Sequence, residues 1–218
     1  SSCAVYGIPP DGLISEYTPR HPINPYGWSK FMCEQILKDA AAAGNAFGAV
    51  GLRYFNAAGA SQWWEIGEDH RPETHLIPIA IAAAAGRRHG LAVHGSDYET
   101  PDGTCVRDYV HVDDLARAHM MALKKITSDT AQFLNVGTGK GHSVMEVVRS
   151  VERVVGKAMD RQMKLEFHNR RPGDPPVLVA DPSLIRKAWG WAPVVTDLDE
   201  IVGSAWKWHR DHPNGYDG

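Results

Sequence analysis

The stretch Asn24–Lys30 (NPYGWSK) constrains this chain more than any other. Asparagine is a preferred N-cap and proline suits the first helical position, so we expect a helix to begin at Pro25. Gly44 is the next strong stop signal and predicts the C-terminal end of that helix. Apolar residues line two sides of it, which predicts cover on more than one face. Tyr26 and Lys30 are four residues apart and share one face.

This tyrosine–lysine spacing has a chemical use. A free tyrosine titrates near pH ~10, which is too high for a base at neutral pH. A nearby ammonium group favours the phenolate and lowers the pKa of the tyrosine. The pair can therefore supply a general base near neutrality, while the lysine is also free to hydrogen-bond a ribose. Tyrosine and lysine at this spacing are common by chance, so the meaning of the pair depends on the rest of the chain.

Composition and charge limit the classes of function. The chain has 218 residues, enough for one large domain or two small ones. A net charge of -3 without a basic run argues against nucleic-acid binding. The longest apolar stretch, Leu76–Ala85, is too short to span a bilayer. The three cysteines fit a reducing cytosol, and neither they nor the 11 histidines show a metal-ligand spacing. We therefore expect a cytoplasmic protein with no membrane, nucleic-acid or metal partner.

Two polar side chains follow predicted strand ends in the first quarter of the chain. Val50–Phe55 is a short apolar run that predicts a buried parallel strand ending at Asn56. Ser2 also has the character of a strand end, although no apolar strand precedes it. Ligands of open α/β sheets bind beyond the carboxyl ends of the strands. We therefore expect Ser2 and Asn56 at a binding site.

The remaining sequence alternates predicted helices and strands. Residues 57–74 form a long polar loop of a kind that is often functional. Trp63 and Trp64 in this loop could form a lid, a packing anchor or a partner contact, and we favour packing. Gly137–Gly141 lacks the spacing of phosphate-binding loops, and we interpret it as a strand-to-helix turn. Periodicity, caps and stop signals predict helices over 75–86, 114–125, 143–156, 181–190 and 197–210, and strands over 91–94, 133–136 and 164–167.

Four stretches together resemble a known enzyme family. Three of them are SSCAVYG at Ser1–Gly7, NPYGWSK at Asn24–Lys30 and RYFN at Arg53–Asn56. With these the chain is similar to the extended short-chain dehydrogenase/reductase superfamily. The fourth, GTCVRDYVHVDDL at Gly103–Leu115, narrows the resemblance to UDP-glucose 4-epimerases. The resemblance covers essentially all 218 residues.

The resemblance implies an α/β fold, namely the C-terminal part of a Rossmann-type doubly wound parallel sheet plus a smaller α/β substrate-binding domain. Residues 1–56 would be the remainder of the NAD-binding domain. Residues 57–218 would mainly form the UDP-sugar-binding domain, with segments that return to the Rossmann sheet. The family's Gly-x-Gly-x-x-Gly fingerprint is absent from the sequence. We therefore expect an N-terminally truncated chain that lacks several strand–helix units, on the order of 100 residues. Family members commonly pair through the tyrosine-bearing helix, which implies a homodimer of the full-length protein.

The same resemblance implies an NAD-dependent isomerase that interconverts UDP-glucose and UDP-galactose. Tyr26 would be the base that takes the proton of the 4-hydroxyl group while hydride leaves C4 for enzyme-bound NAD. Return of the hydride to the opposite face of a transient 4-keto sugar would invert C4. Ser2 would hydrogen-bond the same oxygen, and Lys30 would hold the cofactor ribose. Phe55 matches a family position that touches the nicotinamide.

Ten further positions match the UDP-sugar side of the family's site. Arg107 and Arg171 match positions near the diphosphate, where arginine suits bidentate contact, although Arg170 is an equal candidate for the second contact. Asp174 fits a contact with the uridine-side ribose, and Leu178 lies where the family gates substrate size. The other positions match the sugar–diphosphate side (Asn56, His75 and Leu76) or the uracil edge (Ala92, Val93 and His94).

Several alternatives stay open from the sequence. A nucleotide-sugar 4,6-dehydratase shares the Tyr-x-x-x-Lys pair, but carries an acidic pair where this chain has Cys3-Ala4 after Ser2. A UDP-pentose 4-epimerase would use the same residues. A leucine at position 178 leaves N-acetylated sugars open as substrates. The missing fingerprint also allows a fragment that binds UDP-sugar without activity.

Overall fold

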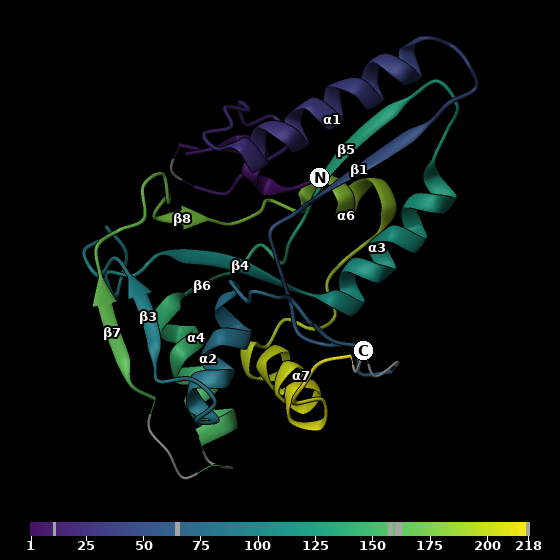
Figure 1. Cartoon of the computed structure of the whole chain (residues 1–218). Coiled ribbons are helices and arrows are strands. Elements are labelled where there is room, and N and C mark those ends of the chain that lie inside the picture. Colours follow the sequence, from purple (N-terminus) through teal and green to yellow (C-terminus); the bar gives the residue numbers. More distant parts are fainter. Residues whose placement is uncertain (11, 64–65, 157–158, 160–162, 217–218) are drawn as a thin grey trace.

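The computed structural model describes residues 1–10, 12–63, 66–156, 159 and 163–216 (Figure 1). Two short turns, the 3-10 helix η1 (Cys3–Tyr6) and the π-helical η2 (Glu152–Gly156), accompany the longer elements. The helices are α1 (Pro25–Ala42), α2 (Leu76–Ala84), α3 (Val112–Lys125), α4 (Val144–Val151), α6 (Ser183–Trp189) and α7 (Leu198–Asp211). The strands are β1 (Ala49–Tyr54), β2 (Asn56–Ala58), β3 (Leu91–His94), β4 (Val106–His111), β5 (Ala131–Val136), β6 (Gly141–Ser143), β7 (Leu165–His168) and β8 (Val177–Leu178).

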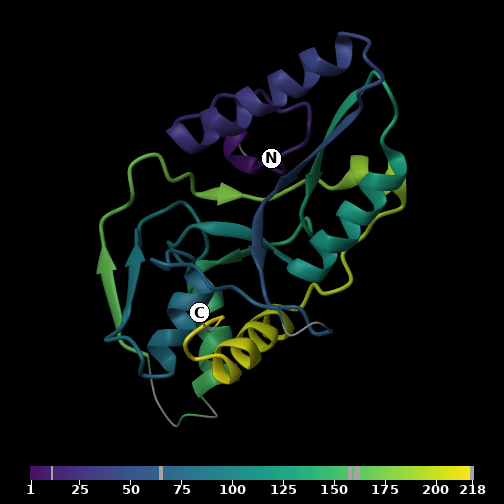
Figure 2. The same cartoon turned by 45° about the vertical axis from the view of Figure 1, so that its right-hand side comes forward.

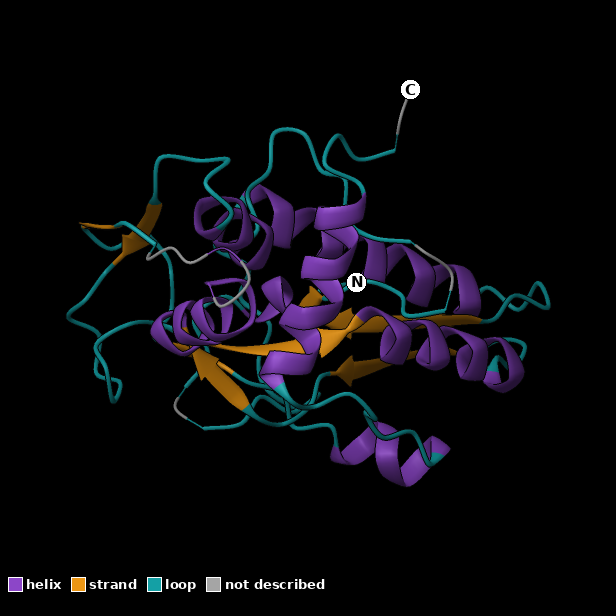
Figure 3. Cartoon of the chain, turned by 90° about the horizontal axis from the view of Figure 1, so that it is seen from below, coloured by secondary structure: helices purple, strands orange, loops and turns teal. Residues whose placement is uncertain are grey.

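Parallel strand pairs form the framework of the fold. β1 and β5 pair in parallel from Ala49 beside Ala131 to Tyr54 beside Val136. β4 is parallel to β2 and β8 and antiparallel to β6, and β3 is parallel to β7. Helices lie on both sides of the strands (Figure 3), as parallel strands with apolar faces require. The predicted α/β fold is confirmed.

Helix α1 lies along β1 and β5 (Figure 1) and begins where the sequence predicts. The side chain of Asn24 caps it by accepting a hydrogen bond from the Gly27 amide at 2.8 Å. Gly27 allows α1 to lie directly on η1, because a Cβ atom at this position would meet the Ala4 carbonyl oxygen at 2.5 Å. The helix end that carries Tyr26 is thereby held against the first residues of the chain.

The outer surface of α1 departs from the sequence prediction. The helix was expected to be covered on more than one face, yet Trp28, Met32 and Ile36 are 46%, 56% and 65% exposed. The described elements pack against the side that carries Gly27, Glu34 and Ala41, the buried residues of α1. The prediction of two covered faces is therefore wrong for this chain.

Two apolar clusters form most of the interior. One lies among α2, α4, α7 and the strands beside them, which gather in the lower part of Figure 2, and includes Ile77, Ile81, Val93, Val147 and Ile201. The other lies between β1, β4, β5, α3 and α6 and includes Leu52, Val110, Leu134, Ile185 and Trp191. The second cluster joins residues from before and after position 56, so later segments do pack on the first strand.

Most predicted elements are confirmed, and the predicted caps of α4 and α7 are formed. Ser143 Oγ accepts from the Glu146 amide at 3.0 Å and the Glu146 carboxylate accepts from the Ser143 amide at 2.7 Å, completing the capping box of α4. Asp197 caps α7 by accepting from the Glu200 amide at 3.0 Å. Strands β2, β4, β6 and β8 were not predicted, because they are ordered by pairing with one another more than by a pattern of their own.

The tryptophan pair in the 57–74 loop was expected to pack inside. Trp63 is instead 79% exposed, so the prediction is wrong for this residue. Trp64 lies outside the described residues. The loop runs over the surface between β2 and α2, where backbone polar groups reach water.

Candidate active site

Residues that the sequence placed at a catalytic centre line one cavity of about 570 Å³. Ser2, Tyr26, Phe55, Asn56 and His75 all contribute to its wall. Ser2 reaches the cavity because it pairs in parallel with Tyr54, the last residue of β1. Phe55 and Asn56 follow directly after that strand. The predicted convergence of strand ends is therefore what the fold produces, although the roles of these residues stay predictions.

Tyr26 and Lys30 lie on the same side of α1. The Lys30 Nζ atom is 5.3 Å from the centre of the Tyr26 ring. Tyr26 is 56% exposed and faces the 570 Å³ cavity, while Lys30 borders a neighbouring hollow that also contacts Ser1 and Tyr54. The phenol is thus open to a ligand and has an ammonium group beside its ring.

A buried polar network holds α1 on the sheet, and the sequence analysis missed it. The Glu34 carboxylate accepts two hydrogen bonds from Arg53, both at 2.7 Å, and one from Ser1 at 2.6 Å. Arg53 also donates to Tyr6 Oη at 2.7 Å, and this hydroxyl donates to Asn135 at 2.7 Å. Glu34 and Arg53 are 1% and 3% exposed. The spacing 26, 30, 34 along one helix is the sequence signal that could have pointed to Glu34.

The charges in this network are matched. Burial favours the neutral carboxyl of Glu34, but hydrogen bonds from Arg53 and Ser1 outweigh it and hold the pKa of Glu34 below its usual range. Burial raises the pKa of Tyr6 to about 12, so this phenol stays protonated at neutral pH and is no candidate for a base. Among the described tyrosines at this end, the exposed Tyr26 is the one that both reaches the cavity and stands beside a lysine.

The structure joins two residues that the sequence had placed separately on the predicted nucleotide side. Arg107, only 9% exposed, forms an ion pair with Asp174 and donates to the Val106 carbonyl oxygen at 2.7 Å. Leu178 lies beside Arg107 in the β4–β8 pairing and packs against the apolar cluster that contains Phe55. These contacts connect the predicted diphosphate, ribose and sugar-gating positions.

Asp108, the neighbour of Arg107, is a second buried carboxylate that the sequence analysis missed. It accepts hydrogen bonds from the Thr138 amide at 2.9 Å, the Thr138 hydroxyl at 2.6 Å, the Gly139 amide at 3.0 Å and the Ala180 amide at 3.2 Å. Burial raises the pKa of Asp108 above its usual range despite these donors. Because its carboxylate occupies the amides of the Gly137–Gly141 turn, the interpretation of that turn as structural is supported.

The predicted uracil edge lies on β3. Val93 is fully buried in the core, so only its backbone is available to a ligand, whereas Ala92 is exposed. The His94 ring stacks on His168 with their centres 5.4 Å apart. Burial and then the neighbouring Arg171 lower the pKa of His94, which favours a neutral ring near pH 7.

The two candidate arginines of the 170–171 pair differ in their surroundings. Arg170 forms an ion pair with Asp97 and lies 4.3 Å from the centre of the Tyr98 ring. Within the described part of the chain, the Arg171 side chain has no hydrogen-bond or ion-pair partner. Arg171 is therefore the better placed of the two to contact a ligand.

The positions before α2 border both the large cavity and a smaller one. His75 lines both and contacts the Glu68 carboxylate through Nδ1, and Leu76 lines the smaller cavity with Asn56. The sequence showed no metal-ligand spacing, yet the fold gathers two histidines and two glutamates at this rim.

No helix among the described residues is long and apolar enough to cross a membrane.

Comparison with known proteins agrees with this geometry. The model of the NAD dependent epimerase/dehydratase family matches residues 1–137. A UDP-glucose 4-epimerase of Azospirillum brasilense is 50% identical over 211 residues, which are 96% of this chain and 59% of that protein. The structure of UDP-glucose 4-epimerase from Brucella ovis in complex with NAD is 48% identical with a TM-score of 0.86, over 95% of this chain and 62% of that one.

A second solved structure is also close in fold. UDP-glucose 4-epimerase from Bifidobacterium longum, in complex with NAD+ and UDP, has a TM-score of 0.91 and 39% identity, over 99% of this chain and 64% of that one. The chain spans about three fifths of the curated relatives that it matches, 64% and 59% for the first two. The family match covers more than half of the chain. The chain therefore belongs to the NAD dependent epimerase/dehydratase family.

Proposed function

We propose that this chain is the part of an NAD-dependent UDP-glucose 4-epimerase that carries the general base and the UDP-sugar site. One observation carries the proposal. Ser2, Tyr26 and the Phe55–Asn56 strand end come from three separate segments, yet they line one cavity. The Lys30 ammonium group stands 5.3 Å from the ring of Tyr26. Relatives and solved structures named as UDP-glucose 4-epimerases support the same reaction.

The residues at this cavity fit a nicotinamide cofactor. Phe55 offers an apolar surface and the exposed Tyr26 offers a polar group, with the half-buried Lys30 beside it in the neighbouring hollow. The cavity is in the size range of ligand sites. We assign Ser2, Tyr26, Lys30 and Phe55 to the cofactor side. When bound, NAD supplies the hydride acceptor and donor of the reaction.

Side chains of this chain then remove and return the proton of the sugar hydroxyl group. Tyr26 takes the proton of the 4-hydroxyl group and returns it after the sugar has turned over. Ser2 Oγ accepts from the Ala4 amide at 3.2 Å, which leaves its own proton to be donated to the same sugar oxygen. Lys30 supplies positive charge beside Tyr26, with its Nζ atom 5.3 Å from the centre of the phenol ring.

Positively charged side chains bind the nucleotide end of the substrate. Arg107, at the start of β4, is held by Asp174 and supplies positive charge to the diphosphate, and Arg171 supplies a second cation. Asp174 contacts the uridine-side ribose. The neutral His94 ring and the exposed Ala92 border the uracil, with the Val93 backbone between them.

The sugar contacts come from the large cavity and from the smaller cavity beside it. Asn56, His75 and Leu76 surround the sugar–diphosphate junction. Leu178 limits the space available beside the sugar, because it packs with Phe55 in one apolar cluster. Rates with UDP-glucose, UDP-N-acetylglucosamine and UDP-xylose, compared between Leu178 and Leu178→Tyr, measure this gate. We expect the tyrosine to reduce the N-acetylated substrate most.

The central test uses the chain extended at its front by the glycine-rich segment expected from the resemblance. Incubated with UDP-glucose, it should yield UDP-galactose without net formation of NADH. Accumulation of a 4-keto-6-deoxy sugar would establish a dehydratase instead and overturn the proposal. If the extended chain bound UDP-sugar without turnover, it would be a binding protein, and the proposed enzymatic activity would be wrong.

The 218-residue chain alone gives a second test. We expect no bound NAD after purification, measured by denaturation and enzymatic assay of the supernatant. Stoichiometric NAD would show that these residues bind the cofactor without a glycine-rich segment. Our expectation that NAD binding requires that segment would then be wrong.

We also propose that the full-length protein is a homodimer that pairs through α1. The exposed stripe Trp28, Met32 and Ile36 supports this, because apolar side chains at such spacing are typical of an interface. Light scattering on the extended chain should give twice the monomer mass. The substitution Met32→Glu should lower it to that of one chain.

A further inference from the structure

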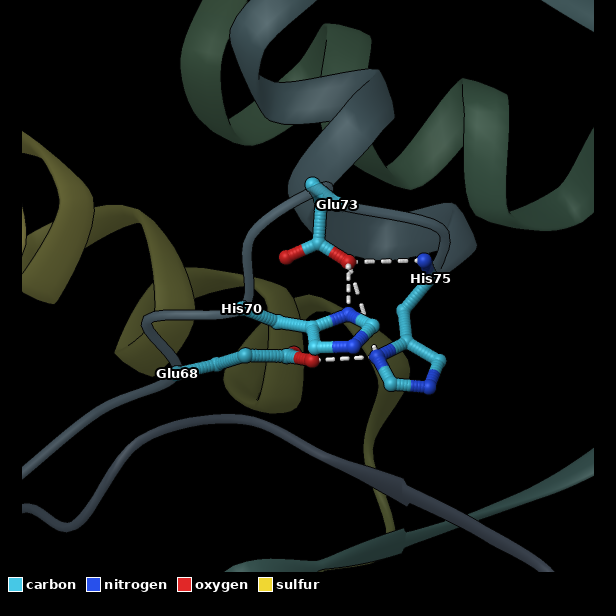
Figure 4. A group of neighbouring side chains, drawn as sticks. All are labelled: Glu68, His70, Glu73 and His75. Carbon is cyan, nitrogen blue, oxygen red and sulfur yellow. Dashed lines mark hydrogen bonds and ion pairs between the residues drawn. The ribbon is translucent and has the colours of Figure 1, made fainter.

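The segment 68–75 gathers four metal-ligating side chains on one side of a loop. Glu68, His70, Glu73 and His75 each place one ligand atom within 4.8 Å of those of the other three. Figure 4 shows the two imidazole rings and two carboxylates turned toward a common point beside the start of α2. These residues are half-buried or exposed, so an ion in solution can reach them.

The spacing of the ligand atoms suits a small cation. Glu73 Oε1 lies 3.5 Å from His70 Nδ1 and 3.5 Å from His75 Nδ1. A tetrahedral zinc ion with bonds of about 2.0–2.1 Å separates its ligand atoms by roughly 3.4 Å. The close contact between His75 Nδ1 and the Glu68 carboxylate is a hydrogen bond. It opens when Nδ1 binds a metal, and the ring proton is then carried by Nε2.

The loop is held in shape by contacts outside the cluster. Asp69 forms an ion pair with Arg71 and accepts from the Tyr216 amide at 3.1 Å. Tyr216 Oη is 2.9 Å from both the amide and the carbonyl oxygen of Gly67. Trp208 Nε1 donates to the Glu68 carbonyl oxygen at 3.3 Å. The backbone that carries the ligands is therefore tied to the C-terminal part of the chain.

The ligands are also oriented within the cluster. Glu73 Oε1 accepts from the amides of Thr74 and His75 at 2.7 and 2.8 Å, which fixes the carboxylate. The rings of His70 and His75 stack with their centres 5.1 Å apart. Preorganised side chains lower the cost of binding an ion, because they do not have to be ordered first.

We propose that Glu68, His70, Glu73 and His75 form a zinc site. Two carboxylates and two neutral imidazoles carry a total charge of -2, which a divalent cation neutralises. Imidazole is a ligand that favours zinc, whereas magnesium and calcium favour oxygen ligands alone. Because Glu68 and His75 also line the 570 Å³ cavity, the ion fixes the loop at its rim.

The site is testable on the 218-residue chain without cofactor or substrate. After chelator treatment, titration with zinc chloride in a calorimeter should show one ion per chain, whereas magnesium chloride should show none. His70→Gln and Glu73→Gln should each weaken zinc binding at least about tenfold, the lower bound for residues that support a metal. The matched control is the double variant His21→Gln, Glu99→Gln, which removes an exposed histidine and an exposed glutamate outside the cluster and should leave binding unchanged.

A second measurement needs no substitution. Cobalt(II) bound to the unaltered chain should give the intense visible absorption of a four-coordinate ion, and NMR should show the ring protons of His70 and His75 shifted by the paramagnetic centre. Zinc competition should abolish both signals. Absence of zinc binding, equal binding by the His70 and Glu73 variants and the control, or shifts confined to other histidines would overturn the proposal. None of these results depends on epimerase activity.

Discussion

The two predicted halves of the active site each rest on a buried carboxylate, but the two carboxylates are held differently. Beneath the Tyr26 end, Glu34 is bound by the guanidinium groups of Arg53 and Arg20. Beside the nucleotide end, Asp108 accepts only from backbone amides and a threonine hydroxyl. Cationic partners favour the ionised form of a carboxylate. A buried carboxylate with only neutral partners favours its ionised form less strongly, because burial favours the neutral form.

The difference shows which half of the predicted site is held in place by an ion pair and which half is held by hydrogen bonds to the backbone. The Glu34 network links α1 to β1 and β5 across three segments, so the position of Tyr26 depends on an ion pair. Asp108 links β4 to the turn after β5 and to Ala180, two residues after β8, so the position of Arg107 depends on hydrogen bonds to the backbone. Substitutions at each half should therefore differ in kind as well as in size.

The largest expected effect is on the chemistry at the Tyr26 end. In the extended chain, Tyr26→Phe should reduce turnover by roughly 10²–10⁴-fold, the range of general acid–base catalysis, while UDP-sugar still binds. Steady-state rates and calorimetric affinity separate the two. Tyr17→Phe, which alters a tyrosine that is 86% exposed, is the control and should keep full activity. Unchanged turnover in Tyr26→Phe would exclude this residue as the base.

The next effect tests the ion pair beneath that tyrosine. Glu34→Ala should lower the free energy of unfolding by about 3–5 kcal/mol, because it leaves the buried Arg53 charge without its partner. Denaturant unfolding of the 218-residue chain measures this loss. Asp39→Ala on the exposed side of the same helix should change it by no more than about 0.5 kcal/mol. Equal losses in the two variants would show that the network adds nothing beyond helix stability.

A smaller effect is expected at the nucleotide end. Arg107→Ala should weaken the binding of UDP to the 218-residue chain by about 1.5–3 kcal/mol, the contribution of a hydrogen bond to a charged group. Arg170→Ala is the matched control, since Arg170 is engaged by Asp97 and Tyr98, and it should bind UDP as the unaltered chain does. An affinity that is unchanged in Arg107→Ala would make the Arg107–Asp174 pair purely structural.

The sequence predicted the parts of this site that depend on short spacing. Tyr26, Lys30 and the helix start follow from residues within one turn of each other, and the fold confirms that helix. Glu34 shares their face, but its partner Arg53 is 19 residues away, and no local pattern joins the two. Arg107 and Asp174 were each identified by motif, while their ion pair spans 67 residues and is visible only in the fold. The roles of the site residues and the division at position 56 stay predictions.

The smallest effect separates the two carboxylates by their response to pH. The pKa of Glu34 is lowered in the folded chain, so its contribution to stability is present above the unfolded value of about 4.3 and is lost as the pH falls through the folded pKa. The pKa of Asp108 is raised, so its contribution is present below about 3.9 and is lost as the pH rises through the folded pKa.

Unfolding free energies of the unaltered chain, Glu34→Gln and Asp108→Asn, measured across the acid range, test these opposite signs. The stability advantage of the unaltered chain over Glu34→Gln should shrink toward acid, and its advantage over Asp108→Asn should grow. Two differences that change in the same direction would mean that Asp108 is held as a charged group like Glu34. The backbone amides of the Gly137–Gly141 turn and Ala180 would then stabilise the charge of Asp108 as effectively as the arginines stabilise that of Glu34.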